Sequence, residues 1–386
     1  MNEVLRRSIK ERFTERFGEE PLVVRSPGRV NVIGEHTDYN NGFVLPAAID
    51  KGIYIGLSKR QDDNIVLYSE EFQEEERSSV PGVAISQKHW ANYILGVVDQ
   101  LNKRGHKISG FNLNIDGDVP VGAGLSSSAA VECATAFALI KAFGLDIDRM
   151  EMVKIAQKAE HTFPGVMCGI MDMFASAFGK EGNVIKLDCR SLDYEYVPFQ
   201  IDGYKILLLN TNVKHSLSSS EYNTRRQECA EGVRMLQEGG EKVESLRDAT
   251  IDMLNKHVKP KNETVYQRCK FIVEENQRLL AACDALKAGD WKTLGDKMYG
   301  SHEGLRHEYE VSCKELDFLV DAVRGNKDVI GARMTGGGFG GCTINIVKAD
   351  AIDSLVADLS KRYQEAMGLQ LTPYIALPDN GTSFAE

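Results

Sequence analysis

The spacing of apolar and polar residues predicts helices and strands in both halves of the chain. Near the N-terminus, Leu5, Ile9, Phe13 and Phe17 recur every four residues, as in an amphipathic helix. Apolar runs bounded by turn signals, or alternating with polar residues, predict strands, and Ser-Pro-Gly at 26–28 predicts a turn. The strands predicted in this part are 21–24, 43–57, 64–68 and 111–116.

The rest of the chain predicts a helix-rich centre and a second set of strands. The predicted elements are helices at 131–144, at 147–161 and from about Met171, a strand at 205–213, a helix-rich region at 221–325, strands at 329–334 and 342–348, a helix near 350–367 and a strand near 370–376. This order lacks the regular strand–helix alternation of a doubly wound sheet, and it predicts an α/β or α+β fold. With 386 residues and about 150 per domain, we expect two domains, 1–200 and 201–386.

The amino-acid composition excludes several classes of partner and location. The 46 Lys and Arg against 56 Asp and Glu give a net charge of −10, which argues against a nucleic-acid or anionic-membrane partner. No segment of 18 uncharged apolar residues is present, so no membrane span is expected. The eight cysteines are scattered without a C-x-x-C pair, which predicts reduced, mostly buried thiols in a cytoplasmic protein.

The stretch PVGAGLSSSAA at 120–130 follows a predicted strand and opens a helix. Gly122 and Gly124 allow a tight turn, and the serines 126–128 stand where helix N–H groups and the helix dipole favour a phosphate. The loop lacks the lysine of a Walker A motif, and serine stands at 127 where a dinucleotide fingerprint needs glycine. The alternative is an ordinary N-cap with extra serines.

Three further stretches carry chemistry. GRVNVIGEHTDYNNG at 28–42 places an arginine, two acids and a histidine within the ten residues 29–38, more than a surface turn needs. TGGGFGG has five glycines in 336–341, which form either a generous hairpin or a backbone that approaches a ligand or the serine loop. Asp172 follows the turn CGIM and stands among apolar residues, so it is expected to be paired or functional, the alternative being the cap of the next helix. His161 is expected to be structural.

Together these motifs resemble the galactokinases, members of a superfamily of sugar and metabolite kinases that includes homoserine, mevalonate and phosphomevalonate kinases. GRVNVIGEHTDYN resembles the galactokinase signature, GAGLSSSA the superfamily's ATP loop, and MTGGGFGGC its C-terminal glycine motif. CGIMD and HSLSSSEY also match family positions, while Met173 stands where a polar residue is expected. The resemblance implies an N-terminal ribosomal-protein-S5-like kinase domain and a ferredoxin-like C-terminal domain, with the active site in the cleft between them.

The resemblance also implies the roles of individual residues. Asp172 and Arg29 are the expected catalytic pair. The residues expected to bind the sugar are Glu35, His36, Thr37, Asp38, Asp172 and Tyr222. The residues expected to bind ATP are Ser69, Gly122, Ala123, Gly124, Leu125, Ser126, Ser127 and Ser128, and those expected to bind Mg²⁺ are Ser128 and Glu160.

The implied reaction converts ATP and α-D-galactose to ADP and α-D-galactose 1-phosphate, with Mg²⁺ as cofactor and a monomer as the working form. A polyol needs several fixed hydrogen-bond partners, and a site that pairs each hydroxyl rejects epimers. Two alternatives stay open: a kinase for N-acetylgalactosamine, arabinose or galacturonate, and a sugar sensor that binds without catalysis.

Overall fold

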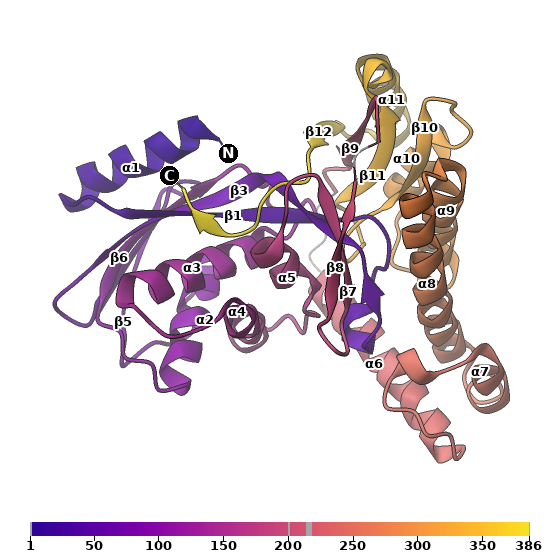
Figure 1. Ribbon diagram of the computed structural model, residues 1–386, viewed down its shortest axis with the longest axis horizontal. Coiled ribbons are helices and arrows are strands. Elements are labelled where there is room, and N and C mark those ends of the chain that lie inside the picture. Colours follow the sequence, from indigo (N-terminus) through magenta and orange to yellow (C-terminus); the bar gives the residue numbers. More distant parts are fainter. Residues whose placement is uncertain (1, 200, 214–217, 386) are drawn as a thin grey trace.

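The computed structural model describes residues 2–199, 201–213 and 218–385, and it has two sheets of four or more strands with helices around them (Figure 1). The helices are α1 Glu3–Phe17, α2 His89–Lys103, α3 Ser127–Phe143, α4 Arg149–Thr162, α5 Met171–Phe178, α6 Ser218–Glu238, α7 Ile251–His257, α8 Glu263–Ala288, α9 Trp291–His307, α10 Lys314–Val323 and α11 Ile352–Met367. The strands are β1 Leu22–Asn31, β2 Phe43–Val44, β3 Pro46–Lys59, β4 Asn64–Ser69, β5 Glu74–Ser79, β6 Phe111–Gly117, β7 Asn183–Asp188, β8 Tyr194–Pro198, β9 Tyr204–Asn210, β10 Val329–Met334, β11 Cys342–Lys348, β12 Thr372–Ala376 and β13 Ser383–Phe384.

The first sheet has the strand order β13-β1-β3-β6-β4-β5, and its pairs are antiparallel except β4 with β6. Helix α1 lies on one side of it, and α2 to α5 lie on the other (Figure 1). Helix α3 contacts β1 and β3 directly, while α5 packs beside it on the same strands. The N-terminus of α3 and the start of α5 are therefore held over β1, where the arginine of the signature stands.

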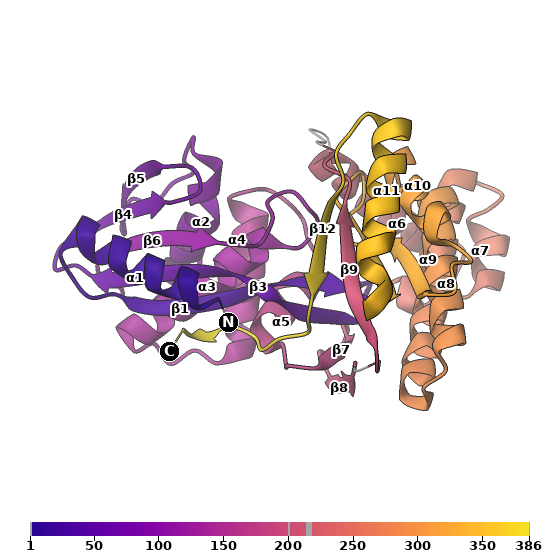
Figure 2. The ribbon, with the colours of Figure 1, turned by 90° about the horizontal axis from the view of Figure 1, so that it is seen from above.

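The second sheet has the antiparallel order β10-β11-β9-β12. Alternate residues of β9 face opposite sides: Ile206 and Leu208 join a core with α9, and Leu207 and Leu209 join a core with α10 and α11. A strand buried on both faces has a continuous apolar sequence, which explains KILLLN at 205–210. Figure 2 shows β9 and β12 beside the end of the first sheet, between it and the helices α8 to α11. The fold is therefore two-domain α+β, as expected.

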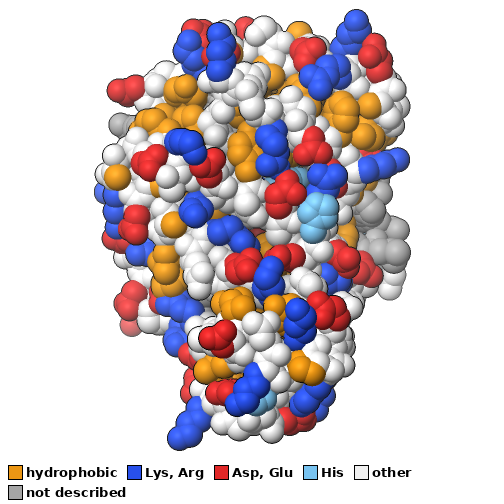
Figure 3. Space-filling model, turned by 90° about the vertical axis from the view of Figure 1, so that its right-hand side faces the viewer, with side chains coloured by type: hydrophobic (Ala, Val, Ile, Leu, Met, Phe, Trp, Pro, Cys, Tyr) orange, Lys and Arg blue, Asp and Glu red, His pale blue; other side chains and the backbone are white. Residues whose placement is uncertain are grey.

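The expected domain boundary at 200 remains a prediction. The end of the chain returns to the N-terminal half, because the last strand, β13, pairs with β1 in the first sheet. A third, small sheet of order β2-β7-β8 lies near the boundary. The helical half carries charges of both signs side by side on the face that Figure 3 shows, in keeping with its many Lys, Arg and Glu residues.

The predicted turn at Ser-Pro-Gly was wrong, because β1 runs through it to Asn31. The register with β3 shifts between Pro27 and Arg29, which accommodates the missing N–H of proline. The predicted strand 43–57 divides into β2 and β3, which pair in different sheets. Helix α2 was not predicted; its N-cap, Lys88, makes no side-chain capping bond, so no start signal marks it.

All eight cysteines are free thiols, and seven of them are buried, as expected. In the described residues no helix has both the length and the apolar character that crossing a bilayer requires.

Candidate active site

The serine loop turns sharply into α3. Gly122, Gly124 and Ser126 all have positive φ angles, of 73°, 75° and 56°. Ser126 is the N-cap of α3, but its hydroxyl makes no capping bond and instead donates to Asp172 Oδ2 at 2.7 Å. The alternative of an ordinary serine cap therefore fails. Because the first N–H groups of a helix have no intrahelical partner, this N-terminus suits an anion.

Arg29 joins the serine loop to α5. Its Nε and Nη2 donate to the two carboxylate oxygens of Asp172 at 2.7 and 3.0 Å, and Nη1 donates to the carbonyl of Gly124 at 2.7 Å. Burial alone lowers the pKa of Arg29, but Asp172 and the other nearby carboxylates outweigh it and raise that pKa. Asp172 does not cap α5 but is paired with Arg29, and its expected catalytic role remains a prediction.

Asp38 lies in a short 3-10 helix, Asp38–Asn40, and also accepts a hydrogen bond from the backbone of Met171 at the start of α5. The N–H of Tyr39 donates to its Oδ1 at 3.0 Å. A Cβ on Gly169 would lie 1.8 Å from Asp38 Oδ2, so only glycine lets the CGIMD turn approach this carboxylate. Burial, and then the negative charge of Asp172, raise the pKa of Asp38 to about 7.

This pKa makes the stability of the ligand-free protein depend on pH. The ordinary pKa of Asp38 is 3.8, so between about pH 4 and 7 the folded state binds this proton more tightly than the unfolded state. Its contribution to stability is therefore lost as pH rises through 7. We expect the wild-type melting temperature to rise relative to that of Asp38→Asn when pH is lowered from 8 to 6. If the melting temperatures of the two proteins change by the same amount between pH 8 and pH 6, the shifted pKa of Asp38 is contradicted.

Glu35 connects the signature to the glycine motif. Its Oε1 accepts from the backbone N–H of Gly336 at 2.8 Å, from Thr335 Oγ1 at 3.3 Å and from Arg333 Nη1 at 3.3 Å. Arg333 is fully buried and also donates to the carbonyl of Asn31 at 3.0 Å. Sequence reasoning missed Arg333, because one arginine in a predicted strand gives no sign that it is buried.

The glycine motif packs on the serine loop, which confirms one of the two interpretations given to it. Gly336 has φ +87°, and a Cβ there would lie 2.9 Å from the carbonyl oxygen of Gly124. Gly341 has φ +79°, and its Cβ would lie 3.0 Å from the carbonyl oxygen of Ala123. The glycine motif therefore packs closely against the backbone of the serine loop.

Gly336→Ala tests this contact. The added methyl forces the two loops apart, so we expect the KM for ATP to rise by about 10-fold or more, for a cost of roughly 1–3 kcal/mol. Gly240→Ala is the matched control, since Gly240 has φ +88° but open space around its Cβ. If steady-state kinetics give the same KM for ATP in both variants, the contact between Gly336 and the carbonyl of Gly124 does not affect ATP binding.

His36 and Tyr222 form an aromatic wall. Their ring centroids are 5.4 Å apart, and His36 Nδ1 lies 2.8 Å from the hydroxyl oxygen of Tyr39. His36 Nε2 is buried, and the ring has a hydrogen bond with the backbone of Gly337. Burial lowers the pKa of His36 to about 3, so the ring is neutral at neutral pH. The start of the HSLSSSEY motif, 214–217, lies outside the described residues, whereas Tyr222 lies within them.

Glu160 lies close enough to Asp172 to be affected by its charge, and it shares a hydrogen bond with Ser128. Glu160 is near the end of α4 and is 6% exposed. Burial, followed by the charge of Asp172, raises the pKa of Glu160 to about 7, and hydrogen bonds from Cys168 and Ser128 lower it in part. His161 Nε2 lies 2.9 Å from the carbonyl oxygen of Cys168, which agrees with a structural role.

One cavity of about 100 Å³ collects most of these side chains. It is lined by Arg29, Glu35, His36, Asp38, Glu160, Val166, Cys168, Gly169, Met171, Asp172, Tyr222, Gly336 and Gly337. Thr37 and Ser69 are not in this lining. The hydroxyl of Thr37 donates to the carbonyl of Gly34 at 2.9 Å, and that of Ser69 accepts from the N–H of Phe72 at 3.4 Å. The expected ATP-binding residues 122–128 are also outside this lining, and the ligand contacts of all the expected site residues remain predictions.

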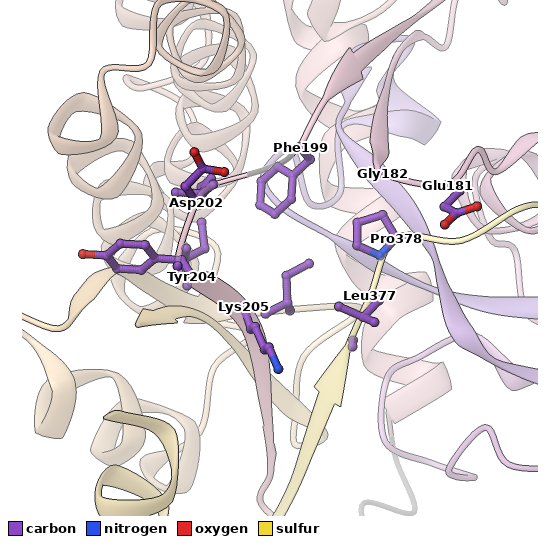
Figure 4. A pocket seen from close by; sticks show the side chains of 13 residues that line it. Glu181, Gly182, Phe199, Asp202, Tyr204, Lys205, Leu377 and Pro378 are labelled. Atoms are coloured by element: carbon purple, nitrogen blue, oxygen red, sulfur yellow. The ribbon is translucent and has the colours of Figure 1, made fainter. Parts of the chain in front are cut away.

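A larger cavity of about 400 Å³ lies elsewhere, between β9, the end of β8 and the segment after β12 (Figure 4). Phe199, Tyr204, Leu377 and Pro378 contribute apolar surface to it. It contains none of the residues that the motifs single out, so the smaller cavity is the candidate active site.

Comparison with known proteins agrees with this geometry. The family described as "Galactokinase galactose-binding signature" matches residues 11–59, and those described as "GHMP kinases N terminal domain" and "GHMP kinases C terminal" match 92–180 and 282–365. The galactokinase of Thermotoga petrophila is 46% identical over 352 residues, 91% of this chain and 96% of that protein. The chain belongs to the galactokinase family. A second galactokinase, from Fusobacterium nucleatum, is 43% identical and covers 97% of both chains.

Solved structures extend the comparison to the fold. The crystal structure of Lactococcus lactis galactokinase complexed with galactose matches with a TM-score of 0.94 and 36% identity, over 99% of this chain and 100% of that one. Methanococcus jannaschii mevalonate kinase matches with a TM-score of 0.64 and 20% identity, over 94% and 99% of the two chains, which shows a shared fold alone. The galactokinase family therefore accounts for nearly the whole chain.

Proposed function

We propose that the protein is an ATP-dependent galactokinase that phosphorylates the C1 hydroxyl of α-D-galactose. The observation that carries the proposal is the unit of Arg29, Asp172 and Ser126, which joins a sugar-sized set of polar side chains to a phosphate-binding loop. Membership of the galactokinase family supports the choice of sugar, and the galactose complex of the Lactococcus lactis enzyme supports it further.

On the sugar side, the cavity offers partners of different kinds. Asp38 and the second oxygen of Glu35 accept hydrogen bonds from hydroxyls, and His36 and Tyr222 supply ring faces and polar edges. Because Asp38 is held by the N–H of Tyr39 and confined by Gly169, it offers its oxygens in one orientation. A site of this kind discriminates between epimers by leaving its own buried groups unpaired.

On the phosphate side, the chain supplies alignment and charge. The serine loop and the start of α3 receive the phosphates of ATP, and Arg29 stabilises charge on the phosphoryl group in transfer. Asp172 accepts or orients the proton of the C1 hydroxyl as its oxygen approaches phosphorus. Because Arg29 and Ser126 fix the carboxylate from three donors, the carboxylate is positioned before the sugar arrives.

Glu160 and Ser128 suit Mg²⁺, which takes hard oxygen ligands and retains several waters. Bound there with ATP, Mg²⁺ supplies charge neutralisation on the phosphates. In the described residues no group of three or more His, Cys, Asp or Glu side chains is arranged to hold a metal. Such a cation therefore takes its other ligands from ATP and water.

Glu160→Gln tests the metal assignment. It removes the one charged ligand, so we expect the Mg²⁺ concentration for half-maximal activity to rise about 10-fold or more, while galactose affinity by calorimetry stays within about 2-fold. Glu151→Gln, on the exposed side of the same helix, is the control. Should the Mg²⁺ titrations of the three proteins coincide, Glu160 is not a ligand.

The proposed function itself is tested by ADP release with Mg-ATP and a panel of sugars. We expect turnover with galactose to exceed turnover with glucose, N-acetylgalactosamine, arabinose and galacturonate. Preference for another sugar of the panel would reassign the substrate, and galactose binding without turnover would favour a sensor. We further propose a cytoplasmic monomer, which the eight free thiols and the need for ATP support.

A further inference from the structure

Helix α8 binds both ends of the loop 34–43, which carries most of the expected sugar-binding residues. The backbone N–H of Gly34, at the start of this loop, donates to Glu275 Oε1 at 3.0 Å. The backbone N–H of Phe43, at its end, donates to Asn276 Oδ1 at 2.9 Å. Two consecutive side chains of one helix therefore hold the two ends of the loop.

These two side chains are themselves fixed by further hydrogen bonds. Glu275 is fully buried; its Oε1 also accepts from the hydroxyl of Ser301 at 2.6 Å, and its Oε2 accepts from Arg278 Nε at 2.7 Å. Asn276 is 7% exposed, and its Nδ2 donates to the carbonyl of Ile272 at 3.0 Å, which leaves its amide oxygen turned toward the loop. Both acceptor oxygens are therefore held in one place before the loop binds to them.

Glycines at the two ends of the loop allow the helix to come this close. A Cβ on Gly34, which has φ +97°, would lie 2.5 Å from Leu279 Cδ1. A Cβ on Gly42 would lie 2.5 Å from Asn276 Oδ1. The glycines that frame the signature therefore fit the surface of α8.

Inside the loop, Thr37 joins the same two ends. Its hydroxyl oxygen lies 2.9 Å from the carbonyl oxygen of Gly34 and 2.5 Å from that of Phe43. At each end the carbonyl thus faces Thr37, while the N–H faces α8. A compact loop fixed in this way from both sides holds the side chains between its ends, at positions 35, 36 and 38, in one arrangement.

We propose that Glu275 and Asn276 are positioning residues for the sugar, which hold loop 34–43 so that its two acids and its histidine face the cavity before galactose binds. The proposal rests on the proposed function, in which this loop binds galactose. Neither residue lines the cavity, so their effect on the sugar is indirect. If one end is released, the loop populates other conformations, and galactose must order it again at a cost in affinity.

Asn276→Ala removes the bond to Phe43 and leaves the carboxylate of Glu275 in place. We expect it to weaken galactose binding about 3- to 10-fold in calorimetry, roughly the effect of one hydrogen bond, and to raise the KM for galactose by a similar factor. The kcat at saturating galactose and the KM for ATP should stay within about 2-fold, since these bonds hold the sugar loop and not the serine loop. Unchanged galactose affinity in folded Asn276→Ala would overturn the proposal.

The pair Glu275→Gln and Glu275→Ala tests the other end of the loop. Glutamine keeps a side-chain oxygen that accepts from the N–H of Gly34, whereas alanine leaves this N–H without its partner. Glu275→Gln should therefore keep more of the galactose affinity than Glu275→Ala. Should Glu275→Ala fail to fold, the test rests on the Asn276 variant.

Asn92→Ala is the matched control for Asn276→Ala. Asn92 of α2 is 3% exposed; its Oδ1 accepts from the backbone N–H of Ser86 at 2.8 Å, and its Nδ2 donates to the carbonyl of Ser86 at 3.0 Å. The control therefore loses the same kinds of hydrogen bond away from the sugar cavity, and its galactose affinity should equal that of the wild type. Equal losses of affinity in the two variants would reduce the effect to general destabilisation and overturn the proposal.

Hydrogen exchange followed by mass spectrometry reads the loop directly. In the ligand-free protein, we expect peptides from 34–43 to exchange faster in Asn276→Ala than in the wild type, and saturating galactose to reduce the difference. Unchanged exchange in this loop, or a uniform increase over the whole protein, would contradict the positioning role.

Asp38→Ala separates this proposal from the proposed function. If Asp38→Ala binds galactose as tightly as the wild type, the proposed sugar site fails, and the positioning role fails with it. If Asp38→Ala loses galactose affinity and Asn276→Ala does not, the positioning role alone fails.

Discussion

Asp172→Asn should lower kcat by at least about 100-fold, in line with the 10²–10⁴-fold range for the loss of a general base. The carboxylate of Asp172 accepts three hydrogen bonds, two from Arg29 and one from Ser126. An asparagine amide at this position turns an N–H donor toward one of these donors, and it cannot take a proton from the C1 hydroxyl. Single-turnover and steady-state kinetics with Mg-ATP measure the loss, while ATP affinity should survive.

Ser126→Ala is the matched comparison for Asp172→Asn. It removes one of the three donors and leaves both the carboxylate and the bidentate pair with Arg29, so we expect a loss in kcat of about 10-fold or less. Arg29→Ala should also lower kcat, and its loss should not add to that of Asp172→Asn, because the two residues act as a unit. An Asp172→Asn enzyme that keeps more than about a tenth of the wild-type kcat would exclude the proton-acceptor role.

Glu35→Leu should destabilise the protein by about 3–5 kcal/mol, the cost of removing one partner from a buried ion pair. It leaves the guanidinium of Arg333 fully buried, with Nε and Nη2 already lacking hydrogen-bond partners among the described residues. The double variant Glu35→Leu with Arg333→Met should be more stable than the sum of the single losses predicts, since no charge is then left unpaired. Urea denaturation of the wild type and of the single and double variants gives the free energies of unfolding to be compared.

Asp358→Leu provides the surface control for this pair. Asp358 lies 2.9 Å from Arg362 on α11, and both side chains are largely exposed. Such a pair contributes about 0–1 kcal/mol, so the midpoint should move little. Equal destabilisation by Asp358→Leu and Glu35→Leu, or strictly additive losses at Glu35 and Arg333, would contradict a desolvated pair between the two domains.

The local motifs predicted the parts of the site that depend on neighbouring residues in the chain. The serine loop and the start of α3 are encoded by glycines at positive φ and by the strand and helix beside them, so periodicity and spacing were enough. Asp172 stood out as an acid among apolar residues, and the structure gives it a partner. The apolar run of β9 likewise predicted a strand with its burial. The alternation of β6 predicted a strand, but a half-buried one, and this was wrong because its polar residues Asn112 and Asn114 are buried as well.

The rest depends on contacts between distant segments, which no local pattern records. Arg333 and Glu35 are separated by 298 positions and meet only because β10 packs beside the signature loop. Tyr309, which follows α9, reaches Tyr39 across 270 positions. Thr37 belongs to the signature, and its hydroxyl donates to the backbone of its own loop, so its expected contact with the sugar remains a prediction. The turn at 26–28 was wrong because sheet pairing overrides a local turn signal.

The most direct test of the central claim is the identity of the product. We expect phosphorus-31 and proton NMR of the protein with Mg-ATP and galactose to show α-D-galactose 1-phosphate accumulating with an equal amount of ADP, and the same spectra of Asp172→Asn to show almost none. Phosphate attached at another hydroxyl of galactose, or ADP formed without any sugar phosphate, would contradict the account.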